Sequence, residues 1–178
     1  MLMAESPLAS DLTWPAPVIV MGVSGCGKSS VGRLLADYLQ AEFIEGDELH
    51  SPANVSKMQA GIALNDDDRW PWLDAIGSRL AAAPKVVVSC SALRKTYRDR
   101  LRVSTGRPLK FVCLHGPRQL LFDRMSARQN HYMPAALLDS QLTTLEIPTE
   151  EDDAIIVDIE RSVQSIVDLA LPLVASRR

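Results

Sequence analysis

The stretch MGVSGCGKSS, residues 21–30, decides the fold of this chain. It contains three glycines within six positions, at 22, 25 and 27, followed by Lys28 and Ser29. Residues 22–29 match the pattern G-x-x-x-x-G-K-[S/T] without a mismatch. Glycines permit backbone angles that turn successive amide N–H groups inward, and such groups form a concave site for an anion. The stretch therefore predicts a loop that cradles the phosphates of a nucleoside triphosphate.

The flanking residues place this loop between a strand and a helix. The apolar run APVIVM precedes it, and SSVGRLLADYLQ follows it with the spacing of a helix that buries one face. The start of that helix adds a partial positive charge to the site. We expect Lys28 to reach the β- and γ-phosphates and the Ser29 hydroxyl to bind Mg²⁺. The other loop residues expected to contact the nucleotide are Gly22, Val23, Ser24, Gly25, Cys26, Gly27 and Ser30.

The rest of the chain repeats the alternation of strand and helix. Further apolar runs predict strands at 41–46, 85–90, 109–115 and 154–159. Helical patterns lie between and after them, at about 51–60, 67–83, 92–104, 117–129, 134–144 and 161–174. Such alternation predicts an α/β fold, in which helices cover both faces of a parallel sheet. We expect functional groups at the carboxyl ends of the strands.

Composition excludes several classes of function. The chain has 178 residues, of which 47% are hydrophobic, enough for one domain with a core. Its net charge of −3 argues against binding to nucleic acid or to an anionic membrane. Residues 1–16 are read as a flexible tail without the pattern of a secretion signal, and 17–178 as a single domain. The three cysteines lack metal-binding spacing, and we expect Cys90 and Cys113 to be buried thiols of a cytoplasmic protein.

The positions of the carboxylates favour a kinase for a small molecule. The N-K-x-D segment of GTPases does not occur in the sequence, and the strand at 85–90 ends in Ser-Cys-Ser rather than in the Asp typical of motor ATPases. Instead, FIEGDELH places Asp47 and Glu48 directly after the second strand, beside the loop. Asp47 can there accept a proton from a substrate hydroxyl or hold the metal. The alternative is that these carboxylates belong to an acidic turn without a catalytic role. This interpretation is favoured more strongly for Glu48 than for Asp47.

Six segments, taken together, resemble the gluconokinase family, whose members are related to shikimate and adenylate kinases. In chain order they are GVSGCGKSS, FIEGDELH, NVSKMQAGIALNDDDRWPWL, SCSALRKTYRDRLR, RMSARQNHYM and SQLTTLEIP. The resemblance covers about residues 18–160, with small departures at Cys26 and Asn130. It implies a three-layer P-loop kinase with a five-stranded sheet of order 2-3-1-4-5. It also implies the use of ATP and Mg²⁺ to phosphorylate the 6-hydroxyl of D-gluconate, which feeds the pentose phosphate or Entner–Doudoroff route. The small molecule D-gluconate is the expected partner, and a homodimer is left open.

Candidate substrate-binding residues lie in the same segments. Asp47 and His50 can bind hydroxyl groups, and Arg69 is assigned by analogy with the arginine of shikimate kinases. The stretch LNDDDRWPWL also reads as a helix start, with Asn65 or Asp66 as the N-cap and Trp70 and Trp72 in packing roles. Ser91 begins the next helix, where Arg94 and Arg98, four residues apart, can clamp a carboxylate or phosphate. A solvated basic face is the alternative for these two arginines.

A lid is expected around residues 124–134. Arg124 and Arg128 are assigned to it as cations that stabilise the transferred phosphoryl group, although the dipole of a helix also favours cations at its C-terminus. His131 is read as a structural residue or a substrate contact. Gln141 and Glu146 either contact the substrate or brace the lid.

Two rival functions remain at the level of the sequence. One is a kinase for another small metabolite, which the LNDDDR and CSALR segments disfavour. The other is a switch that hydrolyses ATP slowly, and it would show no gluconate-dependent formation of ADP.

Overall fold

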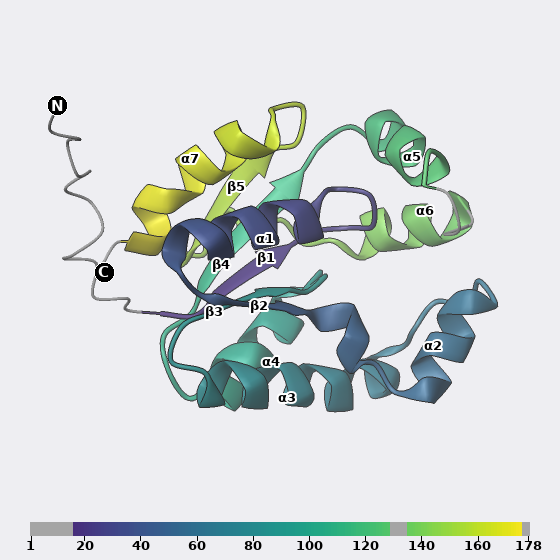
Figure 1. Ribbon diagram of the computed structural model, residues 1–178. Helices are drawn as coiled ribbons and strands as arrows, with labels where there is room; N and C mark the ends of the chain where they lie inside the picture. The colour runs from purple at the N-terminus through teal and green to yellow at the C-terminus, as the bar shows by residue number, and fades with distance from the viewer. Residues whose placement is uncertain (1–15, 129–134, 176–178) are drawn as a thin grey trace, which may run out of the picture.

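Five strands form one parallel sheet in the computed structural model, which describes residues 16–128 and 135–175. Along the chain the strands are β1 (Val18–Met21), β2 (Glu42–Glu45), β3 (Val86–Ser89), β4 (Lys110–His115) and β5 (Ala154–Asp158). Their spatial order is β2-β3-β1-β4-β5, and every neighbouring pair is parallel. This order confirms the prediction. It also makes β1 the central strand, so the glycine-rich loop, which follows the carboxyl end of β1, starts at the middle of the sheet (Figure 1).

Helices cover both faces of the sheet. The described helices are α1 (Lys28–Leu39), the 3-10 turn η1 (Gly46–Leu49), α2 (Pro52–Gln59), α3 (Asp66–Ala82), α4 (Lys95–Thr105), α5 (Arg118–Ser126), α6 (Ala135–Thr144) and α7 (Val163–Ala175). Figure 1 shows α1 and α7 on one face and α3 and α4 on the other, which is the expected three-layer arrangement. No helix within residues 16–128 or 135–175 is long and apolar enough to cross a membrane.

The predicted helices are all present, with ends that differ by no more than three residues. The largest difference at a helix start is in α4. Ala92 has a left-handed φ of 42°, and Arg94 is the N-cap in an extended conformation, with φ −99° and ψ 151°. The helix therefore begins only at Lys95.

The core surrounds the inner strands. β1 and β3 are buried along their whole length, because each has a strand on both sides and helices on both faces. The edge strands β2 and β5 are partly exposed. Cys90 and Cys113 are buried, as predicted, and burial raises the pKa of both thiols to about 12. With Cys26, which is also buried, they are free cysteines.

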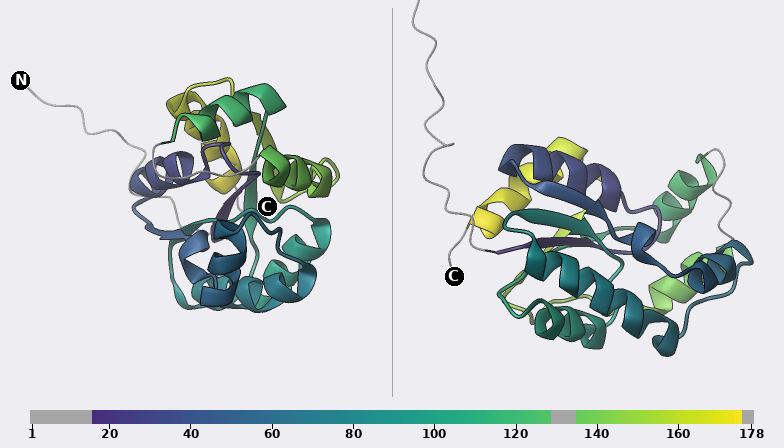
Figure 2. Two further views of the ribbon diagram at one scale, coloured as in Figure 1. Left: turned by 90° about the vertical axis from the view of Figure 1, so that its right-hand side faces the viewer. Right: turned by 60° about the horizontal axis from the view of Figure 1, so that its bottom comes forward.

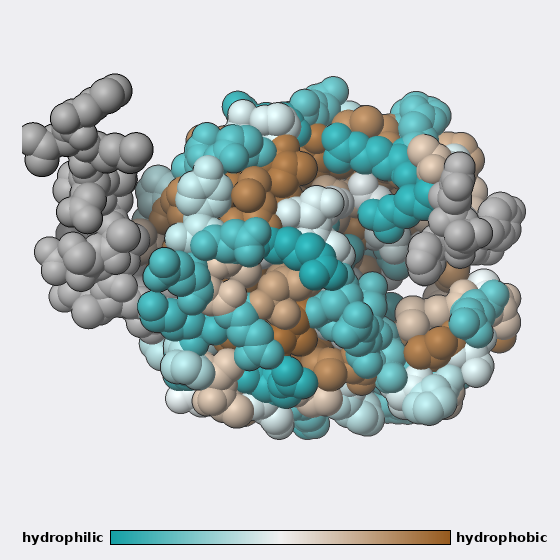
Figure 3. Space-filling view, viewed as in Figure 1, coloured by the Kyte–Doolittle hydropathy of each residue, from teal (hydrophilic) through white to brown (hydrophobic). Residues whose placement is uncertain are grey.

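The carboxyl ends of β1, β2 and β3 meet at one end of the molecule. Hydrogen bonds from main-chain amides hold the turns that follow them: the Gly22 amide donates to the main-chain oxygen of Ser91 at 3.3 Å, and the Gly46 amide donates to the side-chain hydroxyl of Ser89 at 3.2 Å. Helices α2, α5 and α6 lie beyond this end (Figure 2). The space-filling view is hollowed between them (Figure 3). The candidate functional site therefore lies at this end of the molecule.

Candidate active site

The glycine-rich loop, residues 22–27, takes a conformation that glycine adopts most easily. Gly25 and Gly27 have φ values of 82° and 95°, in the left-handed region. A Cβ atom on Gly25 would lie 2.8 Å from the main-chain oxygen of Leu121, so a larger residue does not fit. Gly27 is the N-cap of α1, and no side chain caps this helix. The positive end of the α1 dipole is therefore available to an anion.

The loop side chains divide between the core and the cavity. Val23 and Cys26 are buried, so only their main-chain amides can serve a ligand. Lys28 lies on the cavity side, and its Nζ donates to the main-chain oxygen of Val23 at 3.1 Å. The ammonium group thus lies across its own loop, close to the amides that would bind phosphate.

A carboxylate that the sequence analysis did not single out lies beside Ser29. The Ser29 hydroxyl donates to Glu45 Oε2 at 2.5 Å, and the Ser89 hydroxyl donates to Glu45 Oε1. Glu45 ends β2 and Ser89 ends β3, so three neighbouring elements supply this group. The expected metal pair was Ser29 with Asp47. In the structure the carboxylate in contact with Ser29 is instead that of Glu45.

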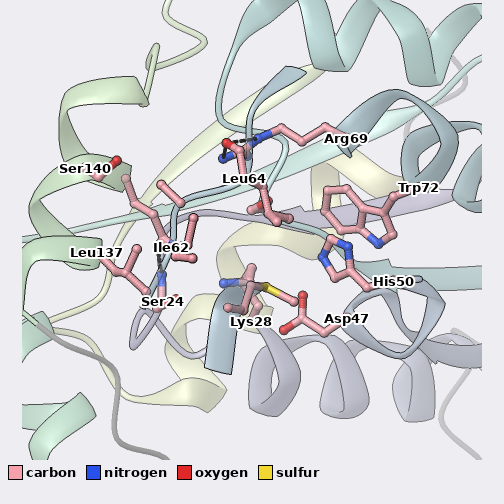
Figure 4. A pocket seen from close by; sticks show the side chains of 14 residues that line it. Ser24, Lys28, Asp47, His50, Ile62, Leu64, Arg69, Trp72, Leu137 and Ser140 are labelled. Carbon is pink, nitrogen blue, oxygen red and sulfur yellow. Dashed lines mark hydrogen bonds between the residues drawn. The ribbon is translucent and has the colours of Figure 1, made fainter. Parts of the chain in front are cut away.

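Two cavities meet at this edge, and both are lined by Ser24 and Asp47. The loop cavity is lined by Ser24, Ser29, Arg33, Glu45, Asp47, Glu48, Met125 and Arg128. The inner cavity is lined by Ser24, Lys28, Asp47, His50, Met58, Ile62, Ala63, Leu64, Arg69, Trp72, Ser91, Leu137, Ser140 and Gln141 (Figure 4). Asp47 therefore stands at the junction, where one carboxylate can contact ligands in both cavities.

His50 is fixed by stacking on a buried tryptophan. Its ring lies 4.1 Å from that of Trp72 at an interplanar angle of 15°. The Trp72 indole donates to the main-chain oxygen of Gly46 at 2.8 Å, so the expected packing role of Trp72 is confirmed, although it also lines the inner cavity. Burial lowers the pKa of His50, which keeps the ring neutral at pH 7. A neutral imidazole can both donate to and accept from a hydroxyl group.

The start of α3 directs Arg69 towards the inner cavity. Asn65 is the N-cap, as one of the two expected candidates, and forms a capping box with Asp68. Lys57 of α2 pairs with Asp68 at 2.7 Å and ties the two helices together. Arg69 donates from Nε and Nη2 to the main-chain oxygen of Leu64, at 3.3 and 3.1 Å. Figure 4 shows Arg69 at the end of the cavity away from Lys28 and Asp47.

A third, outer cavity continues from the inner one. Its lining consists of Leu64, Asn65, Asp66, Asp67, Arg69, Arg94, Tyr97, Ser140 and Thr144. Leu64, Arg69 and Ser140 line both cavities, so the two cavities adjoin at Arg69. Of the other predicted substrate residues, Ser91 lines the inner cavity and Arg94 the outer one.

Arg98 is not a cavity residue, which corrects the expected clamp with Arg94. Its side chain is 1% exposed and forms an ion pair with Glu151 at 2.6 Å. It also donates to the main-chain oxygens of Ala92 and Leu93, at 2.9 and 3.2 Å. The guanidinium group is thus committed to bracing the turn between β3 and α4. We leave Arg98 out of the proposed substrate site.

The residues assigned to the lid fall in different places. Arg128 lines the loop cavity, whereas Arg124 lines neither that cavity nor the inner one and donates to the main-chain oxygen of Ile159 at 2.8 Å. Gln141 of α6 reaches the loop, where its Oε1 accepts from the Ser24 amide at 2.7 Å. Glu146 accepts from the Lys95 amide at 2.7 Å and so caps α4. His131, with the rest of 129–134, lies outside the described residues.

Known proteins resemble the chain over most of its length. The family described as "AAA domain" matches residues 18–148. The gluconokinase of Gluconobacter oxydans is 42% identical over 158 residues, which cover 86% of this chain and 88% of that protein. The thermoresistant gluconokinase of Escherichia coli is 41% identical over 155 residues, covering 84% and 87%. The crystal structure of a gluconokinase from Sinorhizobium meliloti has a TM-score of 0.84 and 53% identity, covering 91% of this chain and 93% of that one.

Proposed function

The chain belongs to the gluconokinase family of P-loop kinases, and on that premise we propose that it phosphorylates D-gluconate. The reaction transfers the γ-phosphoryl group of ATP to the 6-hydroxyl and gives 6-phospho-D-gluconate and ADP. The observation that carries this proposal is the junction of the loop and inner cavities at Ser24 and Asp47. A phosphoryl group passes between two ligands only where their sites meet.

The loop cavity is the proposed site of the nucleotide phosphates. The loop amides and the N-terminus of α1 supply positive potential there. Arg33 and Arg128 line this cavity, and Lys28 lines the adjoining inner cavity. A loose transition state for phosphoryl transfer spreads negative charge over the equatorial oxygens, so cations around it lower the barrier. Arg124 is proposed only as a lid residue that approaches when α5 moves, since its present contact is with Ile159.

The residues beside the loop fit a magnesium ion. Mg²⁺ in such sites is bound by one or two protein groups together with phosphate oxygens, and Ser29 with Glu45 supplies suitable oxygens. Across the described ranges, no cluster of three or more His, Cys, Asp or Glu residues could hold a metal by itself. This agrees with an ion that is bound jointly with the nucleotide. When bound, Mg²⁺ neutralises charge on the β- and γ-phosphates.

The inner and outer cavities are the proposed site of gluconate. Asp47 orients the 6-hydroxyl and takes its proton as the bond to phosphorus forms. The neutral His50 ring and Ser91 bind hydroxyl groups along the chain of the sugar acid. Arg69 and Arg94 lie beyond them and bind the carboxylate.

We also propose a cytoplasmic location for the protein. The use of ATP and the three free, buried cysteines support it.

The test combines an assay of ADP formation with the variant Asp47→Asn. In the wild type, ADP should appear only when gluconate is present; gluconate-independent ADP would favour a nucleotide switch. Asp47→Asn should lower turnover about 100-fold or more, with little change in ATP affinity, because the base is lost while the shape is kept.

The matched control is Glu42→Gln, which removes an exposed carboxylate of the preceding strand β2 that lines neither cavity, and it should leave turnover within about threefold. If Asp47→Asn also stays within threefold, Asp47 is not the base. If its affinity for ATP–Mg²⁺ falls together with turnover, Asp47 acts chiefly on the metal.

A further inference from the structure

We propose that Tyr97 is a positioning residue for binding the carboxylate of the acceptor. Its ring holds the guanidinium groups of Arg69 and Arg94 at the outer cavity. Its hydroxyl holds the side chain of Asp66, which in turn pairs with Arg94. This inference rests on the proposed function and deepens it. It identifies the feature of the site that recognises the acid end of the acceptor.

The geometry around Tyr97 joins two cations to one ring. The Cζ atoms of Arg69 and Arg94 lie 5.2 and 5.9 Å from the centre of the Tyr97 ring. The negative face of an aromatic ring attracts guanidinium groups at such distances. Trp70 packs against the Tyr97 ring in a T-shaped arrangement, with 5.6 Å between the ring centres and an interplanar angle of 78°. Two like charges would otherwise repel, so the shared ring favours keeping them together.

The hydroxyl of Tyr97 extends this arrangement to Asp66. It donates to Asp66 Oδ1, while Asp66 Oδ2 lies 3.5 Å from Arg94 Nη1. Burial is the largest cause that raises the pKa of Tyr97, and the hydrogen bond to Asp66 adds to it, so the hydroxyl remains a donor at neutral pH. Tyr97 therefore sets the position of Arg94 both through its ring and through Asp66.

Both guanidinium groups keep donors for a ligand. Arg69 uses Nε and Nη2 on the Leu64 oxygen, and within the described part of the chain Nη1 has no hydrogen-bond partner. Arg94 is 43% exposed, and its ion pair with Asp66 is long. A carboxylate that enters the outer cavity can accept from both arginines. An acceptor with its hydroxyl end at Asp47 reaches them because Leu64, Arg69 and Ser140 line both cavities.

Tyr97 is 2% exposed, so a purely structural role is the alternative that the experiment must separate. Phe111 offers a matched control, because it is also a buried aromatic with an arginine over its ring, Arg102 at 4.8 Å, but it lines none of the three cavities. The variants are Tyr97→Leu, Tyr97→Phe and Phe111→Leu. Each is assayed for the KM of gluconate, the KM of ATP, kcat and melting temperature.

We expect Tyr97→Leu to raise the KM of gluconate about tenfold, with the KM of ATP and kcat within threefold, since the ring that aligns the cations is gone. Tyr97→Phe keeps the ring and should raise the KM of gluconate about threefold. Phe111→Leu should lower the melting temperature and leave both KM values unchanged. D-glucitol has a hydroxymethyl group in place of the carboxylate of gluconate. The preference for gluconate over D-glucitol should fall in both Tyr97 variants, more in Tyr97→Leu, and stay unchanged in Phe111→Leu.

The proposal is overturned if both Tyr97 variants keep the wild-type KM of gluconate and the wild-type preference over D-glucitol. If Tyr97→Leu does not fold, Tyr97→Phe alone decides, by an unchanged or a raised KM of gluconate. A wild type that forms no ADP with gluconate refutes the proposed function instead, so the two failures are distinguishable.

Discussion

Glu151→Gln tests the assignment of Arg98 as a structural cation. Glu151 is 8% exposed and accepts from Arg98 Nη2 at 2.6 Å and from Arg102 Nη2 at 2.6 Å. Glutamine keeps the size of the side chain and one acceptor oxygen but removes the charge. Arg98, at 1% exposure, is then left as a buried cation without its counter-ion.

Two lines of reasoning give the size of the effect. Removing one partner of a buried ion pair costs about 3–5 kcal/mol of the free energy of unfolding. Independently, the pKa of Glu151 gives a second estimate. Burial is the largest single cause and raises this pKa, but the hydrogen bonds and charges of Arg98 and Arg102 together outweigh it and lower the pKa from 4.5 to about 2. That difference corresponds to roughly 3 kcal/mol, at about 1.4 kcal/mol for each tenfold change in the protonation equilibrium. We therefore expect a loss of about 3 kcal/mol, or a fall of about 6–12 °C in melting temperature.

The assay is urea unfolding of the wild type and the variant at several pH values. Because folding lowers this pKa, the stabilisation by Glu151 is complete above about pH 4.5 and is lost as the pH falls towards 2. The difference between the two proteins should be about 3 kcal/mol at pH 7 and roughly 2 kcal/mol at pH 3.5. The control is Asp74→Asn, which breaks the exposed pair of Asp74 with Arg100 and should cost at most about 1 kcal/mol.

The reasoning is refuted if Glu151→Gln costs no more than Asp74→Asn, or if its cost does not decrease as the pH falls below 4.5. Arg98 would then not depend on Glu151 as a buried counter-ion. The assignment of this arginine to the substrate would have to be reopened.

Three further outcomes are expected. Lys28→Ala should lower turnover by more than about tenfold without changing the circular dichroism spectrum, because Lys28 lies in the cavity and not in the core; higher residual turnover would contradict the nucleotide site. Glu45→Gln should raise the Mg²⁺ concentration for half-maximal activity about tenfold, measured by metal titration, whereas an unchanged midpoint would mean that Glu45 only orients Ser29 and Ser89. His50→Gln should be less stable than the wild type at pH 7, and the gap should narrow as the pH falls through 6.5, since burial of the neutral ring lowers its pKa; a gap that widens would contradict a neutral His50.

The architecture could be predicted because it depends on local patterns. The apolar runs, the helical periodicity and the glycine-rich stretch each involve residues close in sequence, and their alternation restricts the topology. The same kind of local rule limited the N-cap of α3 to Asn65 or Asp66, and the structure has Asn65. Asp47 and Arg69, two of the proposed site residues, accordingly line the inner cavity at the expected edge of the sheet.

The failures involve contacts between residues far apart in sequence. Arg94 and Arg98 were paired by helical spacing, but Arg94 is an extended N-cap, and the partner of Arg98 is Glu151, 53 residues away. Glu45 reads in sequence as an ordinary carboxylate of an edge strand. Only the approach of Ser29, 16 residues earlier, and Ser89, 44 residues later, distinguishes it. Such pairings cannot be deduced from spacing along one element.

The inner cavity has walls that differ in how freely they can be rebuilt. On the loop side the lining residues are Ser24 and Lys28, and a Cβ on the adjacent Gly25 would lie 2.8 Å from the main-chain oxygen of Leu121, so position 25 does not admit a larger residue. On the opposite side, Ile62 is 54% exposed and Ala63 is also exposed, so substitutions there sacrifice little buried area and little stability. Met58 and Leu64 border the same space. Retargeting the enzyme to another sugar acid is therefore a task for positions 58 and 62–64, which a combinatorial library can vary together while the phosphate-transfer machinery stays intact.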